Sequence, residues 1–212
     1  MPSVKTVWAT PEGEKLVAYM ARVSNPANQN NEETAPKLIK YLLKNKHFSP
    51  FEMVNLCVEI ETTRDIARQI LRHRSFTFQE LSQRYAEVPQ DGFEYGEARL
   101  QDSKNRQNSL ESDDKELQKW WTATQARAAL DAQYLYKEAL DKGIAKEAAR
   151  KLLPEGLTVS RMYMNGTLRS WLHYVAIRCD SATQKEHREV ALLCKQEIAK
   201  AFPSMLEILN AD

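Results

Sequence analysis

A cluster of arginines offers the chemistry of phosphate recognition. Arg64 to Arg74 contains four arginines and one aspartate, and Arg72-His73-Arg74 is followed by Ser82 and Arg84, with Glu80 between them. Guanidinium groups form paired, charge-assisted hydrogen bonds with phosphate oxygens, and a serine hydroxyl adds a neutral donor. The pattern therefore indicates a site for a nucleotide or a dinucleotide cofactor. The alternative is a solvated helix face, since exposed helices carry charge routinely.

The three cysteines, Cys57, Cys179 and Cys194, form neither an even set nor a close pair, so we expect neither a disulfide framework nor a metal site. A reactive thiol needs surroundings that stabilise its thiolate. Cys57 lies in a predicted strand among hydrophobic residues and Cys194 lies inside a predicted helix, so both are expected to be small buried residues. Cys179, next to Arg178, is the one that warrants a test.

The overall charge excludes some classes of partner. Thirty Lys and Arg residues are balanced by 29 Asp and Glu residues, a formal net charge of +1, so no net field attracts the protein to nucleic acid or to a membrane. A hydrophobic content of 42% in 212 residues is typical of globular proteins. The apolar runs are far shorter than the roughly 20 residues that cross a bilayer. The first ten residues lack the features of a secretory signal, and we expect a cytoplasmic location.

Hydrophobic periodicity predicts the elements that would position these groups. The clearest is a strand from Val54 to Glu61, where apolar and polar residues alternate, which indicates that one face is buried. The other elements predicted in this part of the chain are a strand at Val4 to Trp8 and helices at Glu12 to Arg22, Glu33 to Lys44 and Asp65 to Leu71.

The middle of the chain combines a polar segment with a long helix. Residues 101–116 contain one large apolar side chain, Leu110, and are predicted to form a long exposed loop. Its part from Gln101 to Asn108 is either a mobile connection or a lid over bound ligands. A helix is predicted from Glu116 to Leu140. Its inner side is expected to carry Trp120, Ala128, Leu135 and Ala139.

Two more elements complete the predicted fold. A strand from Leu157 to Met164 is expected to end at an Asn165-Gly166 turn, and a helix from Asp180 to Ala201 is expected to begin at its aspartate. No internal repeat and no linker with its own composition interrupts the chain. We therefore predict an α+β fold in which residues 1–212 form a single mixed domain, mostly helical, around an antiparallel sheet.

Several motifs, taken in order, resemble those of the flavin-dependent thymidylate synthases. Arg72-His73-Arg74, then seven residues, then Ser82 and Arg84-Tyr85, is similar to that family's signature. The resemblance runs from about Ala21 to the C-terminal helix. The supporting motifs are Ala67-Arg68-Gln69, His47 with Ser49-Pro50-Phe51-Glu52, Arg150 with Leu153-Pro154, and Leu168-Arg169-Ser170 through Arg178.

The resemblance implies an activity, its cofactors and an assembly. The expected reaction is the reductive methylation of dUMP to dTMP, with 5,10-methylenetetrahydrofolate as carbon donor and with FAD, reduced by NADPH, carrying the hydride. Members of the family form homotetramers whose active sites are shared between subunits, and the same is expected here. Neither nucleic acid nor a membrane is an expected partner.

The resemblance also implies which residues bind each ligand. The dUMP residues would be Gln69, Ile70, Leu71, Arg72, Glu80, Leu81, Ser82, Gln83, Arg84, Arg150 and Arg178. The FAD residues would be Ser49, Arg72, His73, Arg74, Glu80, Thr167, Leu168, Arg169 and His173. His47 is a possible neighbour of flavin and folate, although a histidine in its sequence setting is more often a surface residue. The family often has asparagine where this chain has Gln79 and Thr167, which puts the hydrogen bonds there in question.

Arg178 is the predicted catalytic residue. Methylation at C5 of uracil requires an electron-rich ring, and a fixed guanidinium favours the ionised ring without changing its own protonation. This route needs no cysteine nucleophile. Two alternatives remain: a nucleic-acid-binding module that uses Arg64, Arg68, Arg72 and Arg74 on phosphates, and a flavoprotein that has lost the synthase reaction.

Overall fold

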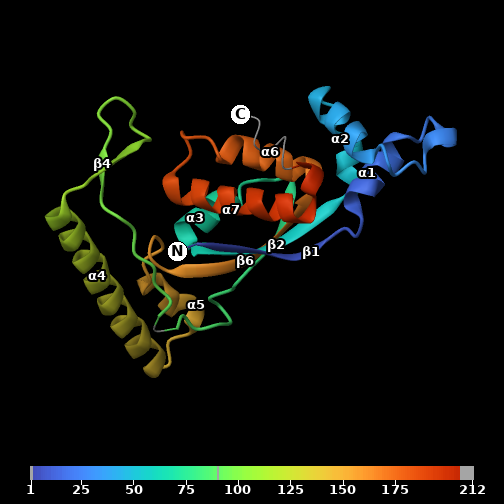
Figure 1. Ribbon diagram of the computed structural model, residues 1–212. Coiled ribbons are helices and arrows are strands. Elements are labelled where there is room, and N and C mark those ends of the chain that lie inside the picture. The colour runs from blue at the N-terminus through green and yellow to red at the C-terminus, as the bar shows by residue number, and fades with distance from the viewer. Residues whose placement is uncertain (1, 90, 206–212) are drawn as a thin grey trace. The chain divides into compact units, whose positions relative to one another are not determined.

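Four strands form one sheet in the order β1-β2-β6-β3 in the computed structural model, which describes residues 2–89 and 91–205 (Figure 1). Neighbouring strands run antiparallel, because residues at the end of one strand hydrogen-bond to residues at the start of the next. The predicted α+β class with an antiparallel sheet is confirmed. The strands are β1 (Ser3–Ala9), β2 (Asn55–Thr63), β3 (Phe76–Glu80) and β6 (Val159–Thr167).

The helices contain more residues than the strands do, as predicted. They are α1 (Gly13–Ala21), α2 (Ala35–Lys44), α3 (Arg64–Ile70), α4 (Lys115–Asp141), α5 (Lys146–Ala149), α6 (Leu168–Arg178) and α7 (Lys185–Ala201). Four short 3-10 helices are η1 (Pro26–Asn28), η2 (Ser49–Met53), η3 (Arg150–Leu152) and η4 (Pro203–Met205). Helix α6 has no counterpart among the predicted elements. Within the described part of the chain, no helix is both long enough and apolar enough to cross a bilayer.

The chain folds into two compact units. Unit 1 comprises Glu61–Ile70 and Glu80–Arg161, and unit 2 comprises Pro2–Ile60, Leu71–Gln79 and the chain from Met162 onward. The unit 2 core contains large, fully buried side chains, among them Trp171, Tyr174, Phe51, Phe202 and Ile39. A smaller core in unit 1 joins Val88, Tyr136, Ala139 and Ala149. The single domain over residues 1–212 stays a prediction.

Strand β2 is buried on both faces, so the prediction of one buried face was wrong. Cys57 and Glu59, predicted to be outward, are only 8% and 9% exposed. The strand lies between β1 and β6 inside the sheet. The Glu59 carboxylate is compensated there by the Lys5 ammonium of β1, 2.7 Å away.

Strand β6 continues through Asn165-Gly166 to Thr167, so the predicted turn is absent at that position. Gly166 serves a different purpose, because a Cβ placed on it would lie 2.4 Å from Cδ1 of Phe76. The ring of Phe76 packs edge-on against Trp171, with ring centroids 4.8 Å apart. The glycine therefore permits the close approach of an aromatic ring to the strand.

The buried side of α4 differs from the predicted one. Ala139 is buried as predicted, whereas Trp120 is 60% exposed and Ala128 and Leu135 are also exposed. Large apolar side chains lie on the outer side of this helix, so hydrophobicity alone did not identify the inner side. The buried side consists of Gln125, Ala129, Ala132, Tyr136 and Ala139.

Two glutamines of α4 bind an extended segment. Gln118 accepts from the backbone N–H of Ala98 and donates to its carbonyl, both at 2.8 Å. Gln125 makes the same pair of bonds with Gly96, at 2.9 and 2.8 Å. The side-chain amides of the helix thereby replace the neighbouring strand that would otherwise satisfy this backbone.

The segment predicted as a long loop contains a β-hairpin. Strands β4 (Arg99–Gln101) and β5 (Ser109–Glu111) pair antiparallel, with Leu100 opposite Leu110. At the tip, the Asp102 carboxylate accepts hydrogen bonds from two backbone N–H groups and from the Asn108 amide. These local bonds order a segment whose composition suggested an unstructured connection.

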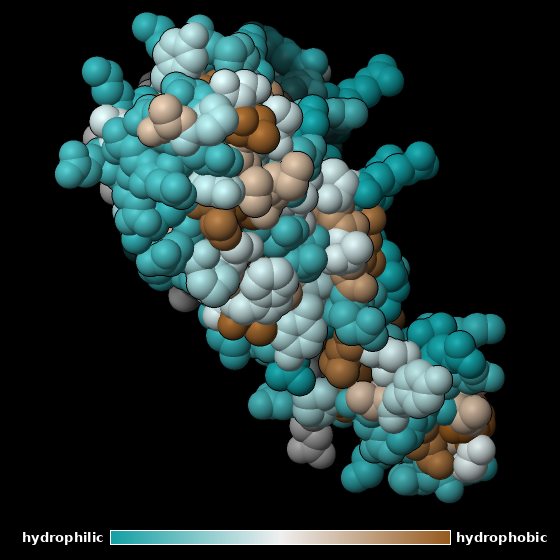
Figure 2. Space-filling view, turned by 90° about the vertical axis from the view of Figure 1, so that its right-hand side faces the viewer, coloured by the Kyte–Doolittle hydropathy of each residue, from teal (hydrophilic) through white to brown (hydrophobic). Residues whose placement is uncertain are grey.

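Helix α7 begins later than predicted. Its first residue is Lys185 and its N-cap is Gln184. The Asp180 carboxylate accepts instead from the N–H of Ala182, in a turn that precedes the helix. The face drawn in Figure 2 carries small apolar patches separated by hydrophilic side chains.

Candidate functional site

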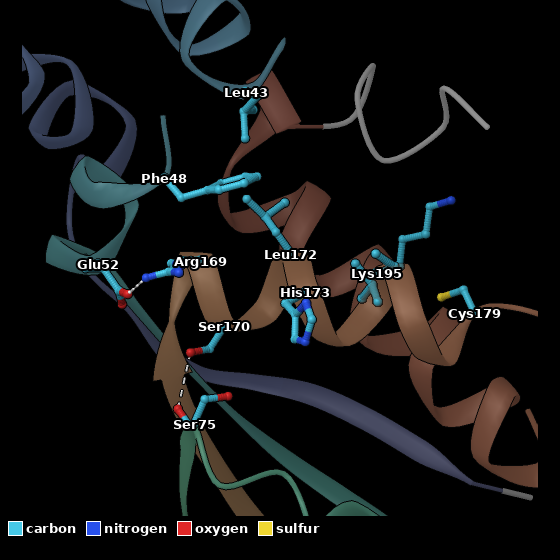
Figure 3. Close-up of a pocket in the computed structure, with 12 residues that line it drawn as sticks. Leu43, Phe48, Glu52, Ser75, Arg169, Ser170, Leu172, His173, Cys179 and Lys195 are labelled. Atoms are coloured by element: carbon cyan, nitrogen blue, oxygen red, sulfur yellow. Dashed lines mark hydrogen bonds and ion pairs between the residues drawn. The ribbon is translucent and has the colours of Figure 1, made fainter. Parts of the chain in front are cut away.

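A cavity of about 640 Å³ opens in unit 2 beside α6 (Figure 3). Phe48 and Leu172 form an apolar part of its lining, and Glu52 and Arg169 lie on another side. Its wall combines apolar surface with cationic and hydroxyl groups, which suits a ligand with both an aromatic and an anionic part. The lining residues are Leu43, Phe48, Glu52, Ser75, Arg169, Ser170, Leu172, His173, Val175, Ala176, Cys179 and Lys195.

The start of α6 is fixed at this cavity by Thr167 and Glu52. The Thr167 hydroxyl caps the helix by accepting from the N–H of Ser170 at 3.2 Å. The same hydroxyl donates to Glu52 at 2.8 Å, and Arg169 donates to the other Glu52 oxygen at 2.6 Å. The hydrogen bonds from Thr167 and Arg169 lower the pKa of Glu52.

The other end of α6 carries Arg178, whose Nε donates to Nε2 of His73 at 2.9 Å. Burial lowers the pKa of His73 to about 4, and the positive charges of Arg178 and His173 act in the same direction. The structure thus joins the predicted catalytic arginine to one residue of the predicted FAD set.

Behind His73 lies a buried pair that the sequence analysis missed. His187 of α7 is fully buried, and its Nε2 lies 3.2 Å from the Tyr174 hydroxyl. Burial lowers the pKa of His187 to about 4. A signal was present in the sequence, because His187 shares one side of a predicted helix with Val190, Ala191 and Cys194.

A second polar cluster lies in unit 1 around Glu80. Its carboxylate accepts from the Ser160 hydroxyl at 2.9 Å and pairs with Arg64 at 3.5 Å and Arg68 at 3.3 Å. Arg64 is buried, so the alternative of a solvated helix face is wrong at this residue. Arg68 pairs in addition with Glu155 at 2.9 Å.

The segment after Glu80 presents a serine and an arginine at the surface of unit 1. The Ser82 hydroxyl accepts from the N–H of Arg84 at 3.3 Å, and the Arg84 side chain donates to Glu147 at 3.2 Å. Gln83 is buried, and within the described part of the chain its amide nitrogen Nε2 has no hydrogen-bond partner. This segment therefore retains polar groups that a ligand could engage.

The predicted dUMP residues are divided between the units. Unit 1 contains Gln69, Ile70, Glu80, Leu81, Ser82, Gln83, Arg84 and Arg150, and unit 2 contains Leu71, Arg72 and Arg178. Ile70 is fully buried, so a ligand would meet its backbone.

The predicted FAD residues belong mostly to one unit. Unit 2 contains Ser49, Arg72, His73, Arg74, Thr167, Leu168, Arg169 and His173, and unit 1 contains Glu80. Arg169 and His173 line the cavity, and Leu168 is fully buried. His47, also in unit 2, is exposed and its ring lies edge-on to Tyr41 with centroids 6.1 Å apart.

The cysteines have the predicted surroundings. Cys57 and Cys194 are buried, and burial raises the pKa of both thiols. Cys179 is partly exposed and lines the unit 2 cavity. Within residues 2–89 and 91–205, no group of three or more His, Cys, Asp or Glu residues is arranged to hold a metal ion.

Comparison with known proteins gives consistent results. The model of a family described as thymidylate synthase complementing protein matches residues 5–204. A flavin-dependent thymidylate synthase of Synechocystis sp. is 52% identical over 201 residues, which cover 95% of this chain and 90% of the relative. A probable flavin-dependent thymidylate synthase of Paramecium bursaria Chlorella virus 1 is 48% identical over 197 residues, covering 93% of this chain and 90% of the relative.

A solved structure agrees with this similarity. The structure of the UMP/dUMP methylase PolB from Streptomyces cacaoi, bound with 5-Br dUMP, superposes with a TM-score of 0.87 at 28% identity. The superposition covers 100% of this chain and 95% of that chain.

Proposed function

The chain belongs to the family of flavin-dependent thymidylate synthases, and from this membership we propose that it binds FAD and methylates dUMP to dTMP. In the proposed reaction, 5,10-methylenetetrahydrofolate supplies the carbon and NADPH supplies the reducing equivalents. The observation that carries the proposal is the unit 2 cavity. Two residues of the predicted FAD set, Arg169 and His173, line it, together with Glu52 and Ser75, which are close in sequence to the predicted residues Ser49 and Arg74.

The groups around this cavity fit the parts of FAD. Lys195 provides a cation for phosphate oxygens, Arg169 adds a guanidinium that is already paired with Glu52, and Ser75 and Ser170 provide hydroxyl groups. Phe48 and the apolar face of α6 provide surface for an aromatic ring system. When bound, FAD would supply the hydride chemistry, which no amino-acid side chain can provide.

For dUMP we propose that Ser82 and Arg84 hold the phosphate and that Arg178 meets the pyrimidine. A guanidinium stays charged at all physiological pH values, so it favours the ionised and more electron-rich form of the ring. Covalent catalysis by cysteine is not part of the proposal, because burial disfavours the thiolates of Cys57 and Cys194.

The nucleic-acid-binding alternative is disfavoured by how its arginines are engaged. Arg64 is buried against Glu80, and Arg68 pairs with both Glu80 and Glu155. Carboxylates therefore compensate two of the four guanidinium groups that such a module would present to phosphates.

A second candidate substrate is UMP. The superposable PolB structure is described as that of a methylase of both UMP and dUMP, and a related structure of it contains 5-Br UMP. UMP differs from dUMP by its 2′-hydroxyl. The two nucleotides should therefore be assayed in parallel.

We further propose a homotetramer with shared active sites. The outer side of α4 supports self-association, because Leu130 and Tyr134 are 70% and 69% exposed and Trp120 lies on the same side. Exposed apolar side chains that gather on one side of a helix form a patch typical of a protein–protein interaction site. Light scattering should give four times the subunit mass, and Tyr134→Glu should lower it. The cytoplasmic location stays a prediction.

The decisive experiment follows tritium release from dUMP labelled at C5. Release should require both NADPH and methylenetetrahydrofolate, and Arg178→Ala should abolish it while the bound flavin, measured by its visible absorbance, remains. Flavin without tritium release would favour the flavoprotein that has lost the reaction. A colourless protein that retards DNA in a salt-dependent manner would favour the nucleic-acid-binding module.

A further inference from the structure

The contact between Arg178 and His73 determines which form of the histidine is present. Nε of Arg178 lies 2.9 Å from Nε2 of His73. A guanidinium has N–H donors and no acceptor, so Nε2 must accept through its lone pair. An imidazole that accepts at Nε2 is uncharged and carries its proton on Nδ1.

The groups around His73 favour this uncharged form. The rings of Tyr174, His187 and Phe76 surround it at 81°, 84° and 84°, with centroid distances of 5.0, 6.3 and 6.5 Å. These near-perpendicular aromatic contacts restrict the plane of the imidazole. The charged or titratable groups that face it come from α6 and α7: Arg178, His173, Tyr174 and His187. A proton on His73 would therefore meet positive charge.

The charge of Arg178 is left uncompensated by this arrangement. Among the residues that the structure describes, no carboxylate forms an ion pair with Arg178. Its Nε is held by a neutral acceptor, and the other guanidinium nitrogens remain available to a ligand. A carboxylate in the place of His73 would orient the group equally well, but it would cancel the positive charge.

We propose that His73 is a positioning residue, which orients the Arg178 guanidinium by accepting from its Nε as a neutral Nδ1–H imidazole and so preserves the positive charge. The proposal deepens the proposed function, since the cation is the group assigned there to the pyrimidine. It also assigns Nδ1–H as a donor. That nitrogen has no hydrogen-bond partner within the described residues, so its N–H is free to donate to a ligand or to solvent.

The first test observes the imidazole directly and does not depend on enzymatic activity. The chain has four histidines, so selective ¹⁵N labelling gives a simple two-bond ¹H–¹⁵N spectrum of the purified protein. At neutral pH, His73 should show a protonated Nδ1 and an unprotonated Nε2, with the signal assigned by its loss in His73→Gln. In Arg178→Met, the tautomer of free histidine, with the proton on Nε2, should return. A charged ring or an Nε2–H tautomer in the unsubstituted protein would overturn the proposal.

The second test separates orientation from charge with three substitutions of His73. The Gln side chain places its carbonyl oxygen near the position of Nε2, whereas Asn places it near Nδ1 and is too short for Arg178. His73→Gln should therefore retain a kcat about tenfold above that of His73→Asn, because one hydrogen bond is worth about a factor of ten. His73→Glu keeps an acceptor in place but neutralises Arg178, and its kcat should fall at least as far as that of His73→Asn.

The variants are compared at equal flavin content, measured by visible absorbance, because His73 also belongs to the proposed FAD set. A structural role alone predicts that the three variants lose kcat in parallel with their unfolding midpoints. A kcat of His73→Gln no higher than that of His73→Asn, or a His73→Glu variant as active as His73→Gln, would overturn the proposal. If the protein lacked synthase activity altogether, the ¹⁵N spectrum would still decide the matter.

Discussion

The Thr167 hydroxyl donates a hydrogen bond to the Glu52 carboxylate at 2.8 Å and so connects the N-terminus of α6 to η2. Because the same oxygen accepts from the N–H of Ser170, both hydrogen-bonding functions of this hydroxyl are used within the protein. The family often has asparagine at this position. The structure accounts for threonine here as a helix cap.

Thr167→Val should therefore destabilise the protein. Valine has nearly the same shape but cannot cap the helix or donate to Glu52, and we expect a loss of about 1–2 kcal/mol in the free energy of unfolding. Thr167→Asn should lose less than half of that, since asparagine is a good cap and its amide can donate to Glu52. Urea unfolding measures both. The control is Thr122→Val at an exposed residue of α4, which should be nearly neutral.

Gly166→Ala should be poorly tolerated. The added Cβ would lie 2.4 Å and 2.6 Å from two atoms of the Phe76 ring, which is itself packed against Trp171. Overpacking of this kind costs about 1–3 kcal/mol. Gly156→Ala is the matched control, because nothing lies within 4 Å of its added Cβ. Equal unfolding midpoints for the two variants would contradict this view of Gly166.

Arg84→Ala should weaken the binding of dUMP. Loss of a charged contact to phosphate costs about 2 kcal/mol, or roughly a 30-fold increase in Kd. In the structure Arg84 pairs with Glu147, and both side chains are exposed. Such pairs contribute less than about 1 kcal/mol, so Glu147→Gln should tighten dUMP binding by no more than about fivefold. Calorimetric titration with dUMP compares the two; an unchanged Kd in Arg84→Ala would remove Arg84 from the proposed site.

Replacing all three cysteines with alanine should leave the proposed catalysis intact. Cys194 is fully buried, and its replacement should lower stability by about 1 kcal/mol through the small cavity left behind. The rate of tritium release should stay within a few-fold of the original at a temperature where the variant is folded. Cys179 is the informative single substitution, since it lines the cavity. Loss of turnover in Cys179→Ala alone would reopen covalent catalysis.

Acid should destabilise the protein through His187. Burial lowers the pKa of this ring from 6.5 to about 4, so between these values the unfolded chain binds a proton that the folded protein does not. The free energy of unfolding is unaffected by this group above pH 7 and falls as the pH drops from 6.5 to 4. The full loss is about 3 kcal/mol. Urea unfolding across this range should show a flatter pH dependence in His187→Gln than in the unsubstituted protein.

Some elements of the fold could be predicted from the sequence, because the period of their apolar residues is compatible with only one type of secondary structure. The alternation in β2 and the spacing in α1 and α2 led to the observed elements. The Asn165-Gly166 pair did not form the predicted turn. Glycine is needed there because the ring of Phe76, which is far away in sequence, lies too close for a side chain. Likewise, glutamines of α4 face inward because they bind the backbone of residues 96–98. A hydrophobicity pattern cannot predict such an inward-facing polar residue.

In the candidate site, too, residues within sequence motifs could be predicted, whereas residues that depend on distant contacts could not. Family motifs led to Arg169, His173 and Arg178, and the structure places the first two at the cavity and the third against His73. His187 carries no motif, and its role depends on Tyr174 and on burial by α6 and α7. Contacts of this kind arise from tertiary packing, which a single sequence does not contain.

The paired hydrogen bonds that Gln118 and Gln125 make with Ala98 and Gly96 attach the β4–β5 hairpin to α4. The four hydrogen bonds hold residues 96–98, which precede β4, and Gln118 also donates to the carbonyl of Ser112, which follows β5, so both ends of the hairpin are fixed to the helix. A partner that binds the exposed side of α4 would therefore also fix the orientation of the hairpin, whose tip carries Lys104 and Arg106.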